Sequence, residues 1–286
     1  MAAKIRRVLS AFGLVLGLCI LAAPSALEIY NRYKAEQVIT SLEDKLDVSS
    51  DPNRLMYLEQ ARAYNARMAG NDYALEGELL PYDDQLSWKG KPYMAYIHIP
   101  DIDLKLPIYH GTAEAELAMG VGHLEGTSLP VGGEPSTCVL EGHSGLQTAR
   151  MFDDIRELDV GDMLCVWTLS EPYAYEVTSW EILSPEEVVP FIRGFSEGDK
   201  VLLVTCTTTP DAAHPRGRIG VNDKRLVVVC DRCEYIESYF AEPSVVESLA
   251  SNSRLKPGLI ALGISAIVVL IVVTSKRRSR KKGGSR

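Results

Sequence analysis

Two long uncharged runs, one near each end of the chain, place the strongest constraint on what it can fold into. The first run, Val8–Leu27, has 20 residues without a charged side chain, and the second, Pro257–Ser275, has 19. A helix needs roughly 20 apolar residues to cross the hydrocarbon core of a bilayer. Both runs are therefore predicted membrane spans, and residues 28–256 must supply the rest of the fold.

Basic residues flank both runs. Lys4, Arg6 and Arg7 precede the first run. The tail 276–286 follows the second run and carries Lys276, Arg277, Arg278, Arg280, Lys281, Lys282 and Arg286. Lys and Arg accumulate on the cytoplasmic side of membrane spans and attract anionic lipid. We therefore predict a two-pass protein of the cell membrane, with both termini in the cytoplasm and residues 28–256 outside.

The first run also admits a second interpretation. Ala22-Ala23-Pro24-Ser25-Ala26 offers small residues of the kind found at a signal-peptide cleavage site. Residues 1–27 are thus predicted to be a cytoplasmic tip with an uncleaved anchor, or alternatively a signal peptide. We favour the anchor.

The outward-facing part is strongly acidic. The two basic ends hold ten of the 30 Lys and Arg residues and none of the 38 Asp and Glu residues. This leaves 20 basic against 38 acidic residues, a formal charge of −18. Such a surface repels nucleic acid and favours cationic partners. Nucleic acid is therefore not an expected partner, although the charge also fits a plain solvated extracellular surface.

Residues 28–70 are predicted to be helical. Apolar residues recur at helical spacing among long polar side chains in Glu28–Leu46. Ser50-Asp51-Pro52 is a helix-start signal, with a capping side chain before a proline in the first turn. The helix that follows is expected over Pro52–Met68. Residues 71–92 show no clear period and form a long lid-like loop, of a length that is usually either functional or mobile.

Short strands dominate residues 93–232. The predicted strands are Ala95–Ile99, Leu104–Tyr109, Ser136–Leu140, Met163–Trp167, Tyr173–Ile182, Val201–Thr205 and Arg225–Cys230. Only short helices are expected between them, near Ala113–Met119 and Arg150–Leu158. This spacing predicts a mainly β fold built as a closed or nearly closed barrel. Residues 233–256 are then an acidic membrane-proximal stalk with some helical character.

Three chemically active side chains lie at the ends of predicted strands. Cys206 ends the apolar run Val201–Thr205, His143 lies in a glycine-flanked turn, and Arg225 opens a later strand. A thiolate can attack an amide carbonyl, an imidazole can protonate the leaving amine, and a guanidinium can hold the carbonyl oxygen. The pattern predicts acyl transfer through a thioester. The plain alternatives are a buried inert cysteine, a structural turn histidine and an arginine paired with a carboxylate.

The remaining cysteines and histidines are expected to be structural. Cys138 and Cys165 lie in apolar strands and are predicted to be core residues, either free or paired with each other. Cys230 and Cys233 follow a strand rather than opening a helix, which favours a local disulfide over a redox site or a zinc site. The histidines assigned to structure are His98, His110 and His123, and His214 is predicted to be a solvated loop residue.

Motifs around the three active side chains resemble those of the sortase family. The family's Thr-Leu-x-Thr-Cys strand is matched by Leu202–Cys206, its Gly-His-x-Gly-Leu turn by Gly142–Leu146, and its Asn-x-x-Arg-Leu pattern by Asn222–Leu226. Further segments resemble the class C, pilus-assembling branch: Ile99-Pro100, Leu106–Gly111 and Gly120–Gly133. The likeness covers residues 50–235 and implies a sortase-like β-barrel.

The resemblance also implies an activity. Class C sortases are membrane-anchored cysteine transpeptidases that cleave a Leu-Pro-x-Thr-Gly-like sorting signal between Thr and Gly. They hold the substrate as a thioacyl intermediate and pass it to a lysine amine of the next pilin subunit. The implied partners are pilin or surface-protein substrates on a Gram-positive type of cell surface, and no cofactor or metal is implied.

Two rival functions stay open. One is a sortase that attaches surface proteins to the cell wall through an amine of the peptidoglycan stem peptide. The other is a catalytically idle barrel that acts as a membrane-tethered adhesin or assembly scaffold. The lid-like segment and the second span favour the pilin interpretation.

Three departures from the family pattern affect the predicted site. Leu202 replaces the first threonine of the strand motif, a change expected to alter only packing. The gap between the cysteine and the favoured arginine is longer than usual in the family, which makes Arg216 and Arg218 rivals. The class C lid carries an Asp-Pro-aromatic motif, and its nearest match, Leu80-Pro81-Tyr82, lacks the aspartate. Pro81 and Tyr82 are therefore predicted to form a lid held mainly by packing, which opens easily.

Overall fold

The computed structural model describes residues 2–44, 52–75, 77–87, 90–146, 148–219, 223–241 and 263. The chain divides into two compact units. One unit comprises Met1–Arg32, Gln147–Ala149 and Pro243–Arg286, and the other comprises Tyr33–Leu146 and Arg150–Glu242. All of the candidate active-site residues belong to the second unit.

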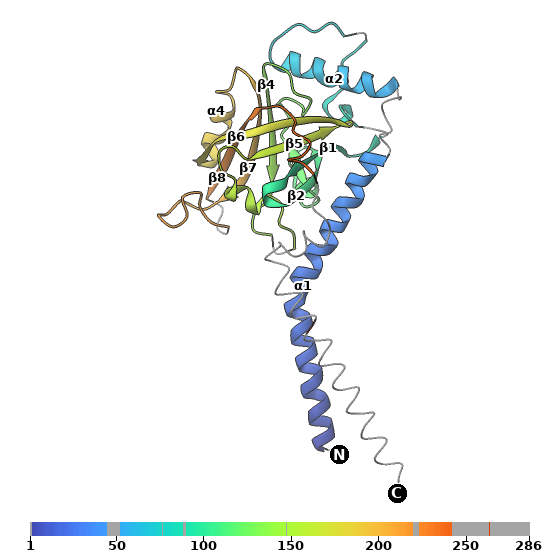
Figure 1. The fold of residues 1–286 in the computed structure, drawn as a ribbon, viewed down its shortest axis with the longest axis vertical. Coiled ribbons are helices and arrows are strands. Elements are labelled where there is room, and N and C mark those ends of the chain that lie inside the picture. The colour runs from blue at the N-terminus through green and yellow to red at the C-terminus, as the bar shows by residue number, and fades with distance from the viewer. Residues whose placement is uncertain are drawn as a thin grey trace. The chain divides into compact units, whose positions relative to one another are not determined.

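Helix α1 (Ala2–Asp44) joins the first predicted span and the helix after it into one continuous element (Figure 1). Its segment Phe12–Leu42 is long and apolar enough to cross a membrane, and no other helix of the described part of the chain meets that test. The last turns of α1 belong to the second unit, where Ile39 and Leu42 are buried in the core. The second predicted span and the basic tail lie outside the described residues.

Eight strands form a closed barrel in the order β1-β2-β3-β4-β7-β8-β6-β5 (Figure 1). Their bounds are β1 Tyr93–Ile99, β2 Leu104–His110, β3 Val121–His123, β4 Ser136–Gly142, β5 Met163–Thr168, β6 Glu171–Leu183, β7 Asp199–Thr207 and β8 Lys224–Arg232. The pairs β2–β3 and β4–β7 are parallel, and the other six neighbouring pairs are antiparallel. The predicted mainly β, closed-barrel fold is confirmed.

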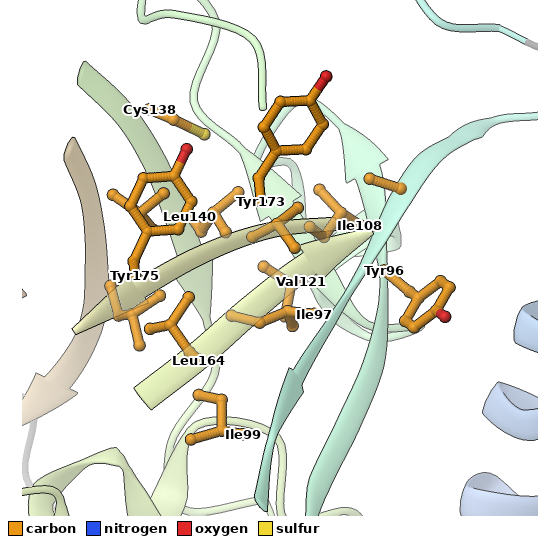
Figure 2. Close-up of a cluster of buried hydrophobic side chains, with 14 of the residues drawn as sticks. Tyr96, Ile97, Ile99, Ile108, Val121, Cys138, Leu140, Leu164, Tyr173 and Tyr175 are labelled. Atoms are coloured by element: carbon orange, nitrogen blue, oxygen red, sulfur yellow. The ribbon is translucent and has the colours of Figure 1, made fainter. Parts of the chain in front are cut away.

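Alternation along the strands separates an interior core from an outer face. On β7, Val201 and Leu203 belong to the main core cluster, whereas Leu202 and Val204 belong to a second cluster that contains residues of helix α4 (Pro185–Ile192). Side chains of successive strand residues point to opposite faces of a sheet, which explains the split. Figure 2 shows interior side chains contributed by several strands and directed toward one another. The barrel interior is therefore a packed apolar core rather than a channel.

Short helices complete the second unit. Helix α2 (Pro52–Met68), helix α3 (Glu114–Leu117) and the 3-10 helix η5 (Asp153–Glu157) lie where the sequence predicts them. Helix α4 was not predicted, because its eight residues include two prolines, Pro185 and Pro190. The further 3-10 helices are η2 (Tyr82–Asp84) and η4 (Pro100–Ile102).

A buried amide on α2 fastens this helix to the loop between β3 and β4. The Asn65 side chain donates hydrogen bonds to the carbonyls of Leu129 (2.9 Å) and Gly132 (3.3 Å). Its own oxygen accepts one from the Leu129 amide at 2.7 Å. Buried polar groups are stable when they are paired in this way.

The beginning of the predicted stalk packs on the barrel. Tyr239 accepts a hydrogen bond at 3.0 Å from the backbone amide of Met163 on β5. Phe240 is buried in a cluster with Met163, Cys165 and Ala174. Aromatic side chains bury large apolar areas, which favours this docking over a free stalk. The stalk prediction from residue 233 is therefore wrong as far as Phe240, and residues 242–256 lie outside the described part of the chain.

All six cysteines are free. The predicted Cys230–Cys233 disulfide is not formed, since Cys230 lies within the extended strand β8 and points into the core. Three residues of extended strand span about 10 Å, whereas the Cα atoms of a disulfide lie about 4.4–6.8 Å apart. Cys138 and Cys165 are also unpaired, because they belong to different clusters of the barrel.

Candidate active site

The three predicted catalytic residues lie on, or directly after, three adjacent strands, β4, β7 and β8. Cys206, on β7, is paired directly with Arg225 on β8. The parallel ladder between β4 and β7 ends at the pair Gly142 and Thr205. His143 and Cys206 are the residues that directly follow this last pair on the two segments. Directly opposed residues in an antiparallel pair have Cα atoms about 4.5–5.5 Å apart. The barrel therefore brings together residues that are far apart in the sequence.

The three side chains are in line with the outer face of the barrel wall. Cys206 continues the outer set of β7. Arg225 stands two residues before Val227, and His143 stands four residues after Val139, and both valines belong to the outer cluster. Because alternate residues share one face, these positions present the thiol, the imidazole and the guanidinium to the same side.

One carboxylate lies close to the histidine, and another interacts electrostatically with the arginine. The Nε2 atom of His143 is buried and lies 3.3 Å from Oε2 of the exposed Glu114, without hydrogen-bond geometry. The carbonyl of His143 accepts a hydrogen bond from the Phe152 amide at 3.0 Å. Burial raises the pKa of Glu141, and the positive charge of Arg225 partly offsets that effect. The site thus combines a thiol, an imidazole and a guanidinium with nearby acidic groups.

Burial separates Cys206 from the cysteines of the barrel core. Cys206 is half-buried, whereas Cys138, Cys165 and Cys230 are buried. Burial raises the pKa of Cys165 to about 12 and also raises the pKa values of Cys138 and Cys230. Those three thiols stay protonated at neutral pH and cannot act as thiolate nucleophiles. Cys206 is therefore the best-placed candidate nucleophile on the barrel strands.

Arg216 is engaged elsewhere. Its guanidinium donates to the carbonyl of Arg156 at 2.9 Å, forms an ion pair with Asp159 at 2.8 Å, and lies 4.8 Å from the ring centre of Trp180. These contacts fix Arg216 as a structural residue of the loop between β7 and β8.

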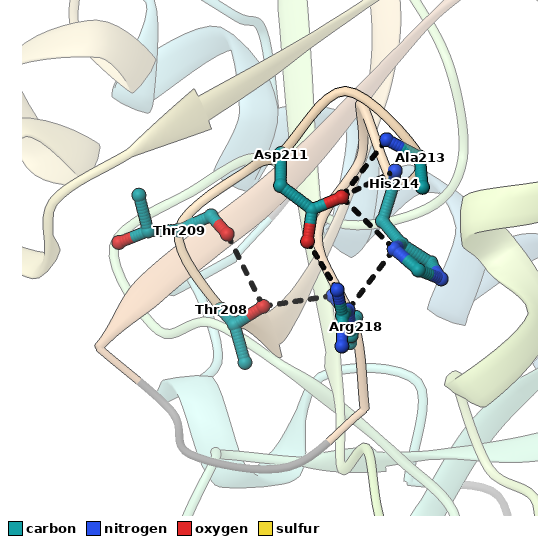
Figure 3. A network of polar contacts seen from close by, with 6 residues as sticks. All are labelled: Thr208, Thr209, Asp211, Ala213, His214 and Arg218. Carbon is teal, nitrogen blue, oxygen red and sulfur yellow. Dashed lines mark hydrogen bonds and ion pairs between the residues drawn. The ribbon is translucent and has the colours of Figure 1, made fainter.

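Arg218 belongs to a polar network in the same loop (Figure 3). It forms an ion pair with Asp211 and donates from Nε to Nδ1 of His214 at 3.0 Å. Hydrogen bonds from His214 and Arg218 lower the pKa of Asp211 to about 2. His214 is a loop residue, as predicted, but it is ordered by this network. Arg225, which stands opposite Cys206, is the arginine that best fits the site.

Tyr82 of the predicted lid is anchored by hydrogen bonds. Its hydroxyl donates to the carbonyl of His123 at 3.0 Å, lies 2.9 Å from Nδ1 of that histidine, and accepts from the Gly111 amide at 2.9 Å. Its ring stacks on His123 and meets His110 edge-on. The prediction that packing mainly holds this segment is wrong, because it missed these polar partners. Pro81 directly precedes η2, and the role of Pro81 and Tyr82 as a lid stays a prediction.

The structural assignment of His123 agrees with its surroundings. This histidine is fully buried, and burial lowers its pKa to about 4. Its Nε2 lies 2.9 Å from the carbonyl of Ser128. It is therefore neutral at physiological pH and holds loops together.

Sequence reasoning missed a further residue near the site. Arg156, on η5, hydrogen-bonds Ser144 and Thr207, which directly follow His143 and Cys206. No sequence signal marks this contact, since its partners lie 12 and 51 positions away and Arg156 itself belongs to none of the motifs described above.

Comparisons with known proteins agree with this geometry. The family model for the Sortase domain matches residues 97–233. Sortase C1 from Streptococcus agalactiae is 33% identical, with a TM-score of 0.59, covering 70% of this chain and 100% of that one. Sortase C from Clostridium perfringens, solved with the C-terminal cell wall sorting motif, is 32% identical, with a TM-score of 0.55, and covers the same shares. Sortase A of Bacillus anthracis is 28% identical over 49% of this chain, and the match spans 60% of that protein's length.

The fold and the matched segments define a closed-barrel protein of the sortase type. The chain belongs to the sortase family. Both solved relatives named above are sortases of the C type.

Proposed function

We propose that this chain is a cysteine transpeptidase that assembles pilin subunits on the outer side of the cell membrane. It cleaves a Leu-Pro-x-Thr-Gly-like sorting signal and joins the new carboxyl end to a lysine amine of a pilin. The observation that carries the proposal is the pairing of Cys206 with Arg225, combined with the ladder that ends beside His143.

The first half of the reaction forms a thioester. The thiolate of Cys206 attacks the threonine carbonyl of the sorting signal, and the negative charge that develops on the oxygen is held by the Arg225 guanidinium. His143 gives a proton to the glycine nitrogen as the carbon–nitrogen bond breaks. The glycine-bearing fragment leaves as a neutral amine, and the threonine carbonyl stays attached to sulfur.

The second half transfers the acyl group. A lysine amine attacks the thioester carbonyl and loses a proton to His143, which restores the imidazolium. The carbon–sulfur bond breaks, Cys206 returns as a thiolate, and an amide bond links the two subunits. The half-buried position of Cys206 supports this sequence, since both substrates must reach the sulfur.

The location of the protein is part of the proposal. Helix α1 provides one segment able to act as a membrane anchor. A two-pass arrangement with the barrel outside follows from the charge pattern of the chain and rests on the second apolar run, Pro257–Ser275.

Mass spectrometry of a covalent adduct tests the proposal. The full chain in detergent is mixed with a sorting peptide, and the expected product is an acyl adduct on Cys206 with release of the glycine-bearing fragment. The matched control is C138A, which removes a core thiol and should leave the adduct intact. An adduct that persists in C206A, or a peptide that remains uncleaved with the wild-type chain, would contradict the proposal.

The choice of acceptor separates pilin assembly from cell-wall attachment. The acyl-enzyme is offered a pilin lysine peptide and a peptidoglycan stem peptide in competition. Preferential transfer to the pilin lysine is expected. Preferential transfer to the stem peptide would instead identify a sortase that anchors surface proteins, and the absence of any acylation would favour the idle scaffold.

A further inference from the structure

One side chain joins the two segments that follow the candidate cysteine and histidine. Arg156 donates from Nη2 to Oγ of Ser144 at 3.0 Å and from Nη1 to Oγ1 of Thr207 at 3.2 Å. Ser144 directly follows His143, and Thr207 directly follows Cys206. The planar guanidinium of Arg156 therefore links the segment that follows the histidine to the segment that follows the cysteine.

This bridge lies just past the point where the backbone ladder stops. The last paired residues of β4 and β7 are Gly142 and Thr205. The hydroxyl of Thr205 also donates to the Gly142 carbonyl at 2.7 Å. Beyond that pair, Arg156 links the two segments. The rigid fork of a guanidinium fixes its two acceptors at a set spacing.

The turn that carries Arg156 is itself tied to the histidine turn. The Nε atom of Arg156 donates to the carbonyl of Asp153 at 2.7 Å. The buried carboxylate of Asp153 accepts a hydrogen bond from the Gly145 amide at 2.6 Å. The Phe152 amide donates to the His143 carbonyl at 3.0 Å. The turn that carries Arg156 is therefore held by hydrogen bonds to the backbone of the turn that carries His143.

Thr207 also connects Arg156 to the loop between β7 and β8. Its hydroxyl accepts from Arg156 and donates to the Arg216 carbonyl at 2.9 Å. The Arg216 guanidinium returns a hydrogen bond to the Arg156 carbonyl at 2.9 Å. Gly217 has a φ of 71°, and a Cβ atom there would come within 2.2 Å of the Thr207 hydroxyl. The loop thus closes tightly around this hydroxyl.

We propose that Arg156 is a positioning residue for the Cys206–His143 pair. Thr207 is fully buried and Ser144 nearly so, and they alternate with the outward-facing cysteine and histidine. Arg156 therefore acts from the inner side of the wall, sets the spacing of sulfur and imidazole, and does not contact the substrate. The inference rests on the catalytic roles proposed above for these two residues.

The test compares R156M with a matched control, R54M. Arg54 also joins distant segments, donating to the Leu169 carbonyl at 2.7 Å and to Glu171 at 2.8 Å, but it lies on α2. Both variants should lower the thermal midpoint. R156M alone should lower kcat for acyl transfer about 10- to 100-fold with KM for the sorting peptide unchanged. It should also move the pH profile of Cys206 alkylation, quantified at that residue by mass spectrometry, to higher pH.

Two further measurements separate positioning from general destabilisation. Guanidinium chloride, far below denaturing concentrations, should restore part of the lost rate in R156M and none in R54M. S144A removes one acceptor of the fork, so its effect should be small in R156M and larger in the wild-type chain, a coupling that a double-mutant cycle measures. If R156M does not fold, S144A and R156K carry the same comparison.

The outcomes separate the two proposals. Wild-type kcat and an unmoved alkylation profile in folded R156M would overturn the positioning role while the transpeptidase proposal stands. If the wild-type chain acylates no sorting peptide, the proposed function fails. A shift of the alkylation profile in R156M would then still support the coupling of Arg156 to Cys206.

Discussion

Cys206 and Arg225 meet because an antiparallel ladder sets them opposite each other, and Cys206 keeps enough exposure for a substrate to reach it. The sequence predicted these positions from strand ends and turn motifs. It also predicted correctly that Cys138 and Cys165 are core residues, but the local Cys230–Cys233 disulfide was wrong, because whether two thiols can pair depends on strand geometry. It also could not show that Arg216 and Arg218 are bound by carboxylates, since Asp159 lies 57 positions from Arg216 and Asp211 meets Arg218 only when their loop folds.

A conservative change at Arg225 should be severely damaging. R225K keeps the positive charge but loses the planar fork that can hold a carbonyl oxygen in a fixed direction. We expect kcat for adduct formation to fall about 100-fold or more, as when an oxyanion donor is removed. The control is R193K, at the exposed end of α4. Stopped-flow or quenched kinetics with the sorting peptide measures both, and a wild-type rate in R225K would exclude the assigned role.

The buried histidine should make stability depend on pH. His123 has a pKa lowered from 6.5 to about 4 by burial. Between these values the unfolded chain binds a proton that the folded chain does not, so stability falls as the pH drops through this window. The contribution of this site is up to about 3 kcal/mol. Denaturant unfolding of the wild-type chain and H123Q at several pH values should show a steeper acid-side slope in the wild type, and equal slopes would contradict the assignment.

At the scale of elements, the pairing of β4 with β7 decides the site. The sequence predicted seven of the eight strands and missed β3, whose three residues lie in a glycine-rich stretch. It also could not show that β7 lies parallel to β4, because this pairing joins segments separated by two intervening strands. The contacts of Tyr82 were missed for a similar reason, since its partners come from the ends of β2 and β3.

Loosening the segment around Tyr82 tests its role as a lid. Y82F leaves the Gly111 amide and His123 without a hydroxyl partner, which should cost about 1–3 kcal/mol of unfolding free energy. If the segment also covers Cys206, iodoacetamide should alkylate that thiol faster in Y82F. The control is Y73F, an exposed tyrosine. A lower stability with an unchanged alkylation rate would show that Tyr82 fastens the fold and does not shield the nucleophile.

At the scale of the whole molecule, the basic clusters at the two ends make a topology prediction. Protease added to intact cells should digest the barrel and leave epitope tags at both termini protected, because both are predicted to lie in the cytoplasm. Permeabilised cells serve as the control, in which both tags should be lost. A C-terminal tag that is removed in intact cells would contradict the two-pass arrangement, and loss of the N-terminal tag during maturation would favour a signal peptide.

The proposed nucleophile and guanidinium lie on β7 and β8, and the imidazole directly follows β4, so the three groups become neighbours only when β7 has paired with both β4 and β8. A newly made chain in which β7 has not yet paired with β4 and β8 carries the thiol at position 206 without the imidazole and the guanidinium beside it. Under the proposed function, such a chain could not form an acyl adduct with a peptide during export. Under the proposed function, the pairing of β7 with β4 and β8 would be the folding step that assembles the active site, and it would follow export.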